Sequence, residues 1–284
     1  MKADQGIAQT ERIVPGVKAE LILSTGERVC LAQRSEFIEG MKESGIRNDS
    51  LAGLNYVGAK IQGEEIGEEI VYNTMQIPVG GFYQLKLADG TKVWLNSLTR
   101  LRFPVTFAGE ERKVYLTGEA YFEVAKDSLN RFVVQAGDLA VEALGTSFNV
   151  KAYEEDNQAV VTLFQGKVKT SVGRDEAFLL PDQAVTYLKN KGQLKKSTLN
   201  DAYRACLWRN NELAFNDEAL SEIAVLLNRM YNIQVVFKSE KVKALRFTGV
   251  ITNNSLDNII ELISLTSPII YTSKGDTIII DEKK

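Results

Sequence analysis

Hydrophobic and polar residues alternate along most of residues 17–188, which is the spacing of strands that bury one face. The stretch around residues 88–90 shows how this spacing selects a turn. A two-residue turn there would set a leucine opposite a lysine and mix apolar and charged side chains on one face. A three-residue turn instead pairs Leu85 with Val93 and keeps that face apolar, with Gly90 supplying the left-handed residue of a bulged turn.

Two further hairpins follow from the same argument. At residues 24–26 a three-residue turn again gives one apolar face. At Gln165-Gly166 the apolar positions have the opposite parity, so a two-residue turn that pairs Leu163 with Val168 is expected. We therefore predict three hairpins, two with bulged turns and one with a tight turn.

More short strands are predicted between these hairpins. Apolar positions are odd-numbered through 139–143 and even-numbered through 148–152, and the change at Gly145 indicates a turn or a bulge. Short strands at regular spacing are typical of an all-β architecture. Residues 17–188 are therefore predicted to be mainly β, forming a sandwich or a roll.

The pattern changes after Trp208, where helical spacing appears. Apolar residues recur at this spacing through 220–227 and through 256–263. We expect Asn216 to cap the first of these helices and Ser255 to cap the second. Strand-like runs surround them, at 212–215, 233–237, 246–251, 269–272 and 277–280. The predicted order is β-α-β-β-α-β-β, a small α+β domain with one modest core.

These patterns divide the chain into four parts. Residues 1–75 are a lead-in that carries one β-hairpin, and residues 76–188 are a β domain. Residues 189–207 are polar and rich in lysine, which predicts a linker. Residues 208–284 are the α+β domain.

Composition removes several classes of function. The chain has 284 residues, no histidine and a net charge of -3. Histidine-dependent triads and histidine-ligated zinc are excluded, and the near-balanced charge gives no electrostatic basis for nucleic-acid binding. Cys30 and Cys206 are too few for a four-thiolate metal site, and we expect free, buried thiols rather than a disulfide. No apolar run approaches the ~20 residues that cross a bilayer, so the chain as given is expected to be soluble.

Candidate reactive groups also have simpler interpretations. Glu119 and Glu123 share one side of a predicted strand about 13 Å apart, too far for a glycosidase pair, so solvated or salt-bridged side chains are expected. The acidic run at 64–69 is interpreted as solvated charge rather than a cation site. Ser147 lacks the Gly-x-Ser-x-Gly context of an activated serine. We therefore predict no catalytic residue, metal site or cofactor.

One alternative function remains open, which is carbohydrate binding by the β domain together with a docking module. It depends on exposed aromatic rings that could stack on a sugar. The candidate rings are Trp94, Tyr115, Tyr121, Tyr153 and Tyr187. In a β-rich domain such side chains also serve as core or rim.

Four segments, in this order, resemble signatures of FecR-type periplasmic domains. They are residues 85–96 (LKLADGTKVWLN), 102–104 (RFP), 117–124 (TGEAYFEV) and 144–150 (LGTSFNV). Pro181-Asp182-Gln183 departs from the Pro-Gly that the family usually has at that turn. The stretch from Trp208 to Ile280 resembles the domain that follows in Bacteroidetes members, which is similar to small signalling and secretin N-terminal folds.

The resemblance implies a non-enzymatic anti-sigma factor that relays a signal from an outer-membrane TonB-dependent transporter to an extracytoplasmic-function sigma factor. It implies that this chain is the periplasmic portion of a protein anchored in the inner membrane, and that the cytoplasmic segment contacting the sigma factor is absent from it. The transporter's signalling domain is then the expected partner, bound at edge strands within 208–284. The expected contact residues are Ile233, Val235, Phe237, Thr277 and Ile279. A purely structural envelope protein is a further alternative.

Overall fold

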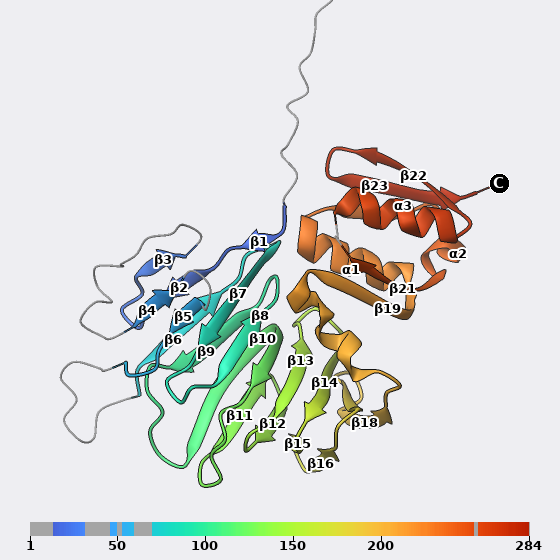
Figure 1. Ribbon diagram of the computed structural model, residues 1–284. Helices are drawn as coiled ribbons and strands as arrows, with labels where there is room; N and C mark the ends of the chain where they lie inside the picture. Colours follow the sequence, from blue (N-terminus) through green and yellow to red (C-terminus); the bar gives the residue numbers. More distant parts are fainter. Residues whose placement is uncertain (1–13, 32–45, 50–52, 60–69, 253–254, 284) are drawn as a thin grey trace, which may run out of the picture. The chain divides into compact units, whose positions relative to one another are not determined.

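The chain forms two compact units, which are described separately below (Figure 1). The computed structural model describes residues 14–31, 46–49, 53–59, 70–252 and 255–283. The first unit is Gly16–Arg209, and the second contains Asn210 and the residues that follow it. The acidic run at 64–69 lies outside the described residues.

The first unit is a sandwich of two sheets, named sheet I and sheet II here. Sheet I has the order β3 (Arg28–Cys30), β2 (Glu20–Ile22), β6 (Tyr72–Gln76), β9 (Arg100–Pro104), β10 (Glu111–Glu123), β11 (Arg131–Ala136), β12 (Leu139–Ala143), β15 (Val168–Val172), β16 (Asp175–Leu179). Sheet II has the order β4 (Arg47–Asp49), β5 (Gly53–Asn55), β7 (Gly81–Lys86), β8 (Lys92–Leu95), β10, β13 (Ser147–Ala152), β14 (Gln158–Gln165), β17 (Gln183–Leu188), β18 (Gln193–Thr198). The short strand β1 (Gly16–Val17) also pairs with β7. For the described residues between 17 and 188, the predicted β architecture is confirmed.

Strand β10 belongs to both sheets. Its residues 111–117 pair with β11 and β9 in sheet I, and its residues 118–123 pair with β8 and β13 in sheet II. The change of sheet occurs at Gly118, which has a φ of 109°. A Cβ atom at this position would lie 2.5 Å from the Thr99 Oγ1 atom, so the crossing requires glycine.

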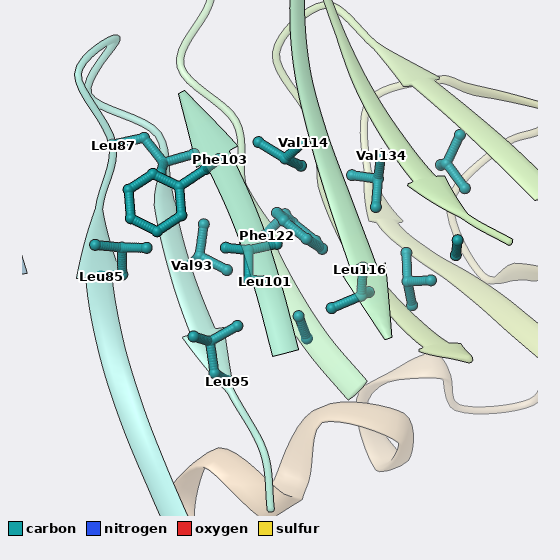
Figure 2. Close-up of a cluster of buried hydrophobic side chains, with 14 of the residues drawn as sticks. Leu85, Leu87, Val93, Leu95, Leu101, Phe103, Val114, Leu116, Phe122 and Val134 are labelled. Carbon is teal, nitrogen blue, oxygen red and sulfur yellow. The ribbon is translucent and has the colours of Figure 1, made fainter. Parts of the chain in front are cut away.

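The hydrophobic core lies between the two sheets, where the alternating apolar positions of both face each other (Figure 2). Leu85 and Val93 enter it from sheet II, and Leu101 and Phe103 enter it from sheet I; all four are fully buried. Because every second residue of each strand faces inward, the remaining residues form the two outer faces.

Two of the three predicted hairpins are confirmed. Leu85 pairs with Val93 across the turn at 88–90, and Leu21 pairs with Val29 across the turn at 24–26. The predicted hairpin at Gln165-Gly166 is wrong, because β14 pairs with β13 and β17 in sheet II while β15 pairs with β12 and β16 in sheet I. The chain passes from one layer to the other at this point. Alternation of apolar residues identifies the core-facing side chains, but a hairpin and a crossing between the sheets both satisfy this alternation.

The predicted linker over 189–207 needs correction. Residues Gln193–Thr198 form β18, which pairs with β17 along six residues at the edge of sheet II. A 3-10 helical segment, η2 (Ala202–Asn210), follows, and Ala202 and Cys206 are buried in it. The polar composition that suggested a linker belongs to an edge strand whose side chains are nearly all exposed.

The second unit has the predicted α+β order with one additional short helix. Its elements are β19 (Glu212–Ala219), α1 (Leu220–Tyr231), β20 (Gln234–Phe237), α2 (Glu240–Lys243), β21 (Arg246–Thr252), α3 (Leu256–Thr266), β22 (Ile269–Lys274) and β23 (Thr277–Glu282). Strands β19 and β21 form one small sheet, and β20, β23 and β22 form another in that order. The apolar faces of α1 and α3 share one core with these strands.

The two predicted helix caps have different outcomes. Ser255 caps α3 as expected, because its hydroxyl accepts a hydrogen bond from the Asn258 backbone N–H. The cap predicted at Asn216 is wrong, since β19 continues to Ala219 and α1 begins at Leu220. Ala219 at the N-cap has no capping side chain. The Glu222 carboxylate accepts from the Ala219 N–H, and the Leu245 carbonyl oxygen accepts from the Leu220 N–H at 2.8 Å.

Among the described residues, no helix is long and apolar enough to cross a membrane.

Candidate interaction surfaces

Three of the four signature segments lie side by side in sheet II. Residues 85–96 contain the end of β7, the turn and β8, residues 117–124 contain the sheet II half of β10, and residues 144–150 lead into β13. The remaining segment, 102–104, lies in β9 of sheet I. The signatures therefore surround the point where β10 joins the two sheets.

Asp89 in the first signature anchors its turn through a buried ion pair. The Arg112 guanidinium donates to Asp89 Oδ2 at 2.7 Å and also to the carbonyl oxygens of Ala125 and Asn130. The Thr91 backbone and hydroxyl donate to the same carboxylate. These partners of Asp89 and Arg112 all belong to the first unit, so the cluster stabilises the fold of that unit.

Glu119 is buried, which corrects the expectation of a solvated or salt-bridged side chain. Its two carboxylate oxygens accept hydrogen bonds from the amides of Asn96, at 2.9 Å, and Asn149, at 3.0 Å. The Trp208 indole in η2 donates to the Asn149 amide oxygen and covers this network. The sequence alone does not reveal this network, because Asn96, Glu119 and Asn149 come from three separate segments. Each of these segments belongs to a signature.

Glu123 forms salt bridges, which is one of the two alternatives expected from the sequence. Its carboxylate lies 3.6 Å from the Lys92 ammonium and 3.9 Å from the Arg209 guanidinium. Glu119 is therefore held by neutral amides and Glu123 by cations.

The five aromatic residues proposed for sugar stacking do not form one exposed surface. Tyr121, Tyr153 and Tyr187 are buried. Burial raises the pKa of the Tyr121 hydroxyl, and the Arg209 guanidinium lies over its ring, 3.5 Å from the centroid. Tyr115 belongs to the other sheet, where it packs with Tyr72. The core-and-rim interpretation therefore fits these rings better than a carbohydrate platform.

The two cysteines are free, as expected, but the expectation that both are buried is wrong for Cys30. Cys30 is exposed and Cys206 is buried, and burial raises the pKa of the Cys206 thiol. Within the described part of the chain, no three acidic or cysteine side chains gather closely enough to hold a metal ion.

The predicted contact residues of the second unit occupy two kinds of position. Val235 and Phe237 are half-buried on β20, which is an edge strand of the three-stranded sheet among the described residues. Ile233 precedes this strand and is buried in the core. Thr277 and Ile279 lie on β23, which is the central strand. The expectation of a free edge at 277–280 is therefore wrong, because both sides of β23 are already paired.

Comparison with known proteins gives matches to both units. The FecR protein family matches residues 73–169, and the family described as FecR, C-terminal matches residues 212–280. Two crystal structures of a candidate anti-sigma factor from Parabacteroides distasonis, at 1.65 and 2.50 Å, are each 31% identical to this chain with a TM-score of 0.70. The aligned region covers 74% and 75% of this chain, and 99% and 100% of theirs. No curated protein matches.

The two-sheet unit with its signature strands, followed by a small α+β unit, defines a regulatory protein of the anti-sigma factor class. The chain belongs to the FecR family.

Proposed function

We propose that this chain is the periplasmic sensor part of a membrane-anchored anti-sigma factor. It relays a signal from an outer-membrane TonB-dependent transporter to an extracytoplasmic-function sigma factor, without catalysis. The observation that carries the proposal is the family match in both units, together with a structural relative that the chain covers almost completely. Membership of the family implies a sigma factor partner, and the transporter is the proposed source of the signal.

The proposed contact with the transporter's signalling domain is the edge of β20 that pairs with no other described strand. Gln234 donates its backbone N–H to Asp276 at 2.7 Å, and Lys238 donates to Ile280 at 3.0 Å. Because backbone groups of a strand alternate in direction, Val235 and Phe237 direct theirs away from β23. A strand of the partner could pair with these groups and extend the sheet.

The side chains of β20 support this choice of edge. Val235 and Phe237 pack against the core, which fixes the strand, while Val236 on the opposite face is 37% exposed. Of the five expected residues, Val235 and Phe237 are therefore proposed as the contact. Ile233, Thr277 and Ile279 are proposed to support it from within the same sheet and core.

Isothermal titration calorimetry with the signalling domain of a transporter from the same organism tests both the proposed function and the proposed contact surface. Val235→Pro removes one outward N–H, and an edge strand tolerates proline. We expect its affinity to fall about fivefold or more, as the loss of one backbone hydrogen bond predicts. Val236→Thr keeps the N–H and should bind within about twofold of the original chain.

Circular dichroism and thermal melting establish that both variants are folded. If no signalling domain of the source organism binds, the proposed function is wrong. If binding occurs but Val235→Pro leaves it unchanged, the β20 edge is the wrong surface.

A further inference from the structure

Four aromatic rings form a continuous row on the outer face of sheet II. They are Trp94, Tyr121, Phe164 and Tyr203, and the successive distances between ring centroids are 5.6, 5.4 and 6.2 Å. The first three come from β8, β10 and β14, at positions that alternate with core residues, and the last comes from η2. The whole row therefore belongs to the first unit.

One end of this row already binds a cation of the chain itself. The Arg209 guanidinium lies 3.5 Å from the Tyr121 centroid and 5.1 Å from the Trp94 centroid. Glu123 completes the arrangement at 3.9 Å. A planar cation over aromatic rings, with a carboxylate beside it, is a favourable combination when it is shielded from water. The Arg209 side chain is only 12% exposed.

The other end of the row borders a cavity of about 620 Å³. Phe164 and Tyr203 line it together with Asp182 and Asp201, and the cavity extends to Tyr121 and Glu123. The pairing of β17 with β18 brings these two acids together, because the Leu199 N–H donates to the Asp182 carbonyl at 2.8 Å, two residues before Asp201. Both acids are exposed to solvent at the cavity.

This end of the row combines aromatic rings with acidic residues, as the first end does, but none of the described residues places a cation over its rings. In the described part of the chain, no lysine or arginine lies over the rings of Phe164 or Tyr203 or forms an ion pair with Asp182 or Asp201. The cavity is lined by one basic residue, Lys126, and by three acids. One of these acids, Glu123, is already paired with Lys92 and Arg209, so Asp182 and Asp201 are the acids left for a ligand. The lining therefore carries a net negative charge beside aromatic surface.

A buried hydroxyl at the same cavity lacks a partner. Thr146 lines the cavity and is 6% exposed, and its Oγ1 atom has no hydrogen-bond partner among the described residues. A buried polar atom left unpaired is unfavourable, because it has lost its hydrogen bonds to water without replacement. A hydroxyl oxygen can accept from N–H donors, which are the groups that ammonium and guanidinium ions present.

We propose that this cavity is a binding site for a guanidinium or ammonium group, held over Phe164 and Tyr203 and paired with Asp182 and Asp201. The ligand is either a free organic cation or a basic side chain of a partner protein. The site belongs to the first unit, whereas the β20 edge belongs to the second, so each proposal can fail without the other.

Backbone amide NMR of the whole chain, titrated with three probes, tests the site. The probes are the peptide Ac-Gly-Arg-Gly-NH₂, the neutral peptide Ac-Gly-Gln-Gly-NH₂ and free L-argininamide. We expect saturable shifts at Ser147 and Gln165, which line the cavity, with the arginine peptide and not with the glutamine peptide. A peptide that binds at least tenfold tighter than argininamide identifies a protein side chain as the ligand. Equal affinities identify a free cation.

The double variant Asp182→Asn/Asp201→Asn removes the charge and keeps the local structure. At residue 182, asparagine tolerates the φ of 62°. At residue 201, asparagine keeps the Oδ1 atom that accepts from the Tyr203 N–H. Affinity for the arginine peptide should fall about two- to fivefold for each carboxylate. Asp175→Asn, at an exposed acid of β16, is the matched control and should change nothing. The proposal is overturned if both peptides give the same shifts, or if the double variant titrates like the original chain.

Discussion

The ion pair between Arg112 and Asp89 gives a sharp test of what stabilises the first unit. The two side chains are 5% and 11% exposed, and the charged atoms are 2.7 Å apart. Arg112→Met keeps much of the side-chain volume and removes every donor. It leaves the Asp89 carboxylate buried without its cation, and it leaves two carbonyl oxygens without the donors that they accept from.

The expected cost follows from this geometry. Removing one partner of a buried ion pair destabilises a protein by about 3–5 kcal/mol. This is a large fraction of the 5–15 kcal/mol by which domains are typically stable. With an m-value of about 2 kcal/mol/M in urea, the unfolding midpoint should fall by about 1.5–2.5 M.

Tryptophan fluorescence is the appropriate assay. The chain has two tryptophans, Trp94 and Trp208, and both belong to the first unit. Urea unfolding followed by their emission therefore reports on this unit alone. Arg131→Met is the matched control, because Arg131 pairs with Glu111 and Glu142 while its side chain is 50% exposed, and it should cost less than about 1 kcal/mol.

A double-mutant cycle with Asp89→Asn isolates the pair itself. The double variant should be more stable than the sum of the two single losses predicts, because the second change removes the charge that the first left unpaired. An Arg112→Met variant within 1 kcal/mol of the original chain, or strict additivity in the cycle, would refute the reasoning.

Three further predictions test other positions. Gly118→Ala should lower the free energy of unfolding of the first unit by about 2 kcal/mol or more, since its new Cβ atom would collide with Thr99; a fluorescence midpoint unchanged in urea contradicts this. The Asp127 carboxylate accepts hydrogen bonds from the Asn130 side chain and from two backbone N–H groups, which lower its pKa from 3.8 to about 2. Its contribution to stability is therefore complete above pH 3.8 and is lost as the pH falls through about 2, and ¹³C NMR of the carboxyl should give that pKa rather than an ordinary one. Ser255→Ala removes the cap of α3 and should cost about 1 kcal/mol in the thermal unfolding of the second unit followed by circular dichroism, with Ser264→Ala near the other end of the same helix as its control.

Many strands and turns of the first unit can be predicted from whether their apolar residues are odd- or even-numbered. The turn at 88–90 could be predicted because only one loop length keeps the apolar residues on one face. The turn at Gln165-Gly166 could not, since the same parity fits a hairpin and a crossing between sheets. Distinguishing them requires knowing which strands are neighbours, and that depends on contacts between distant segments.

The candidate sites also depend on contacts between distant segments that the sequence pattern does not reveal. Alternation places Glu119 on the outer face of its strand, but it cannot show that η2 covers that face and buries the carboxylate. The polar residues of 193–198 resemble a linker because an edge strand with two solvated faces needs no apolar side chains. Likewise, β20 and β23 have similar apolar patterns, and only their order in the sheet separates an edge from a centre.

The continuity of β10 through both sheets has a mechanical consequence. Sliding one layer over the other would break hydrogen bonds on both sides of Gly118 at once, because a single strand is paired in each layer. The sandwich is therefore stiff against shear, and a pull on one layer is carried directly into the other by the backbone. A displacement that reaches this unit moves it as a whole instead of being absorbed by slippage within it.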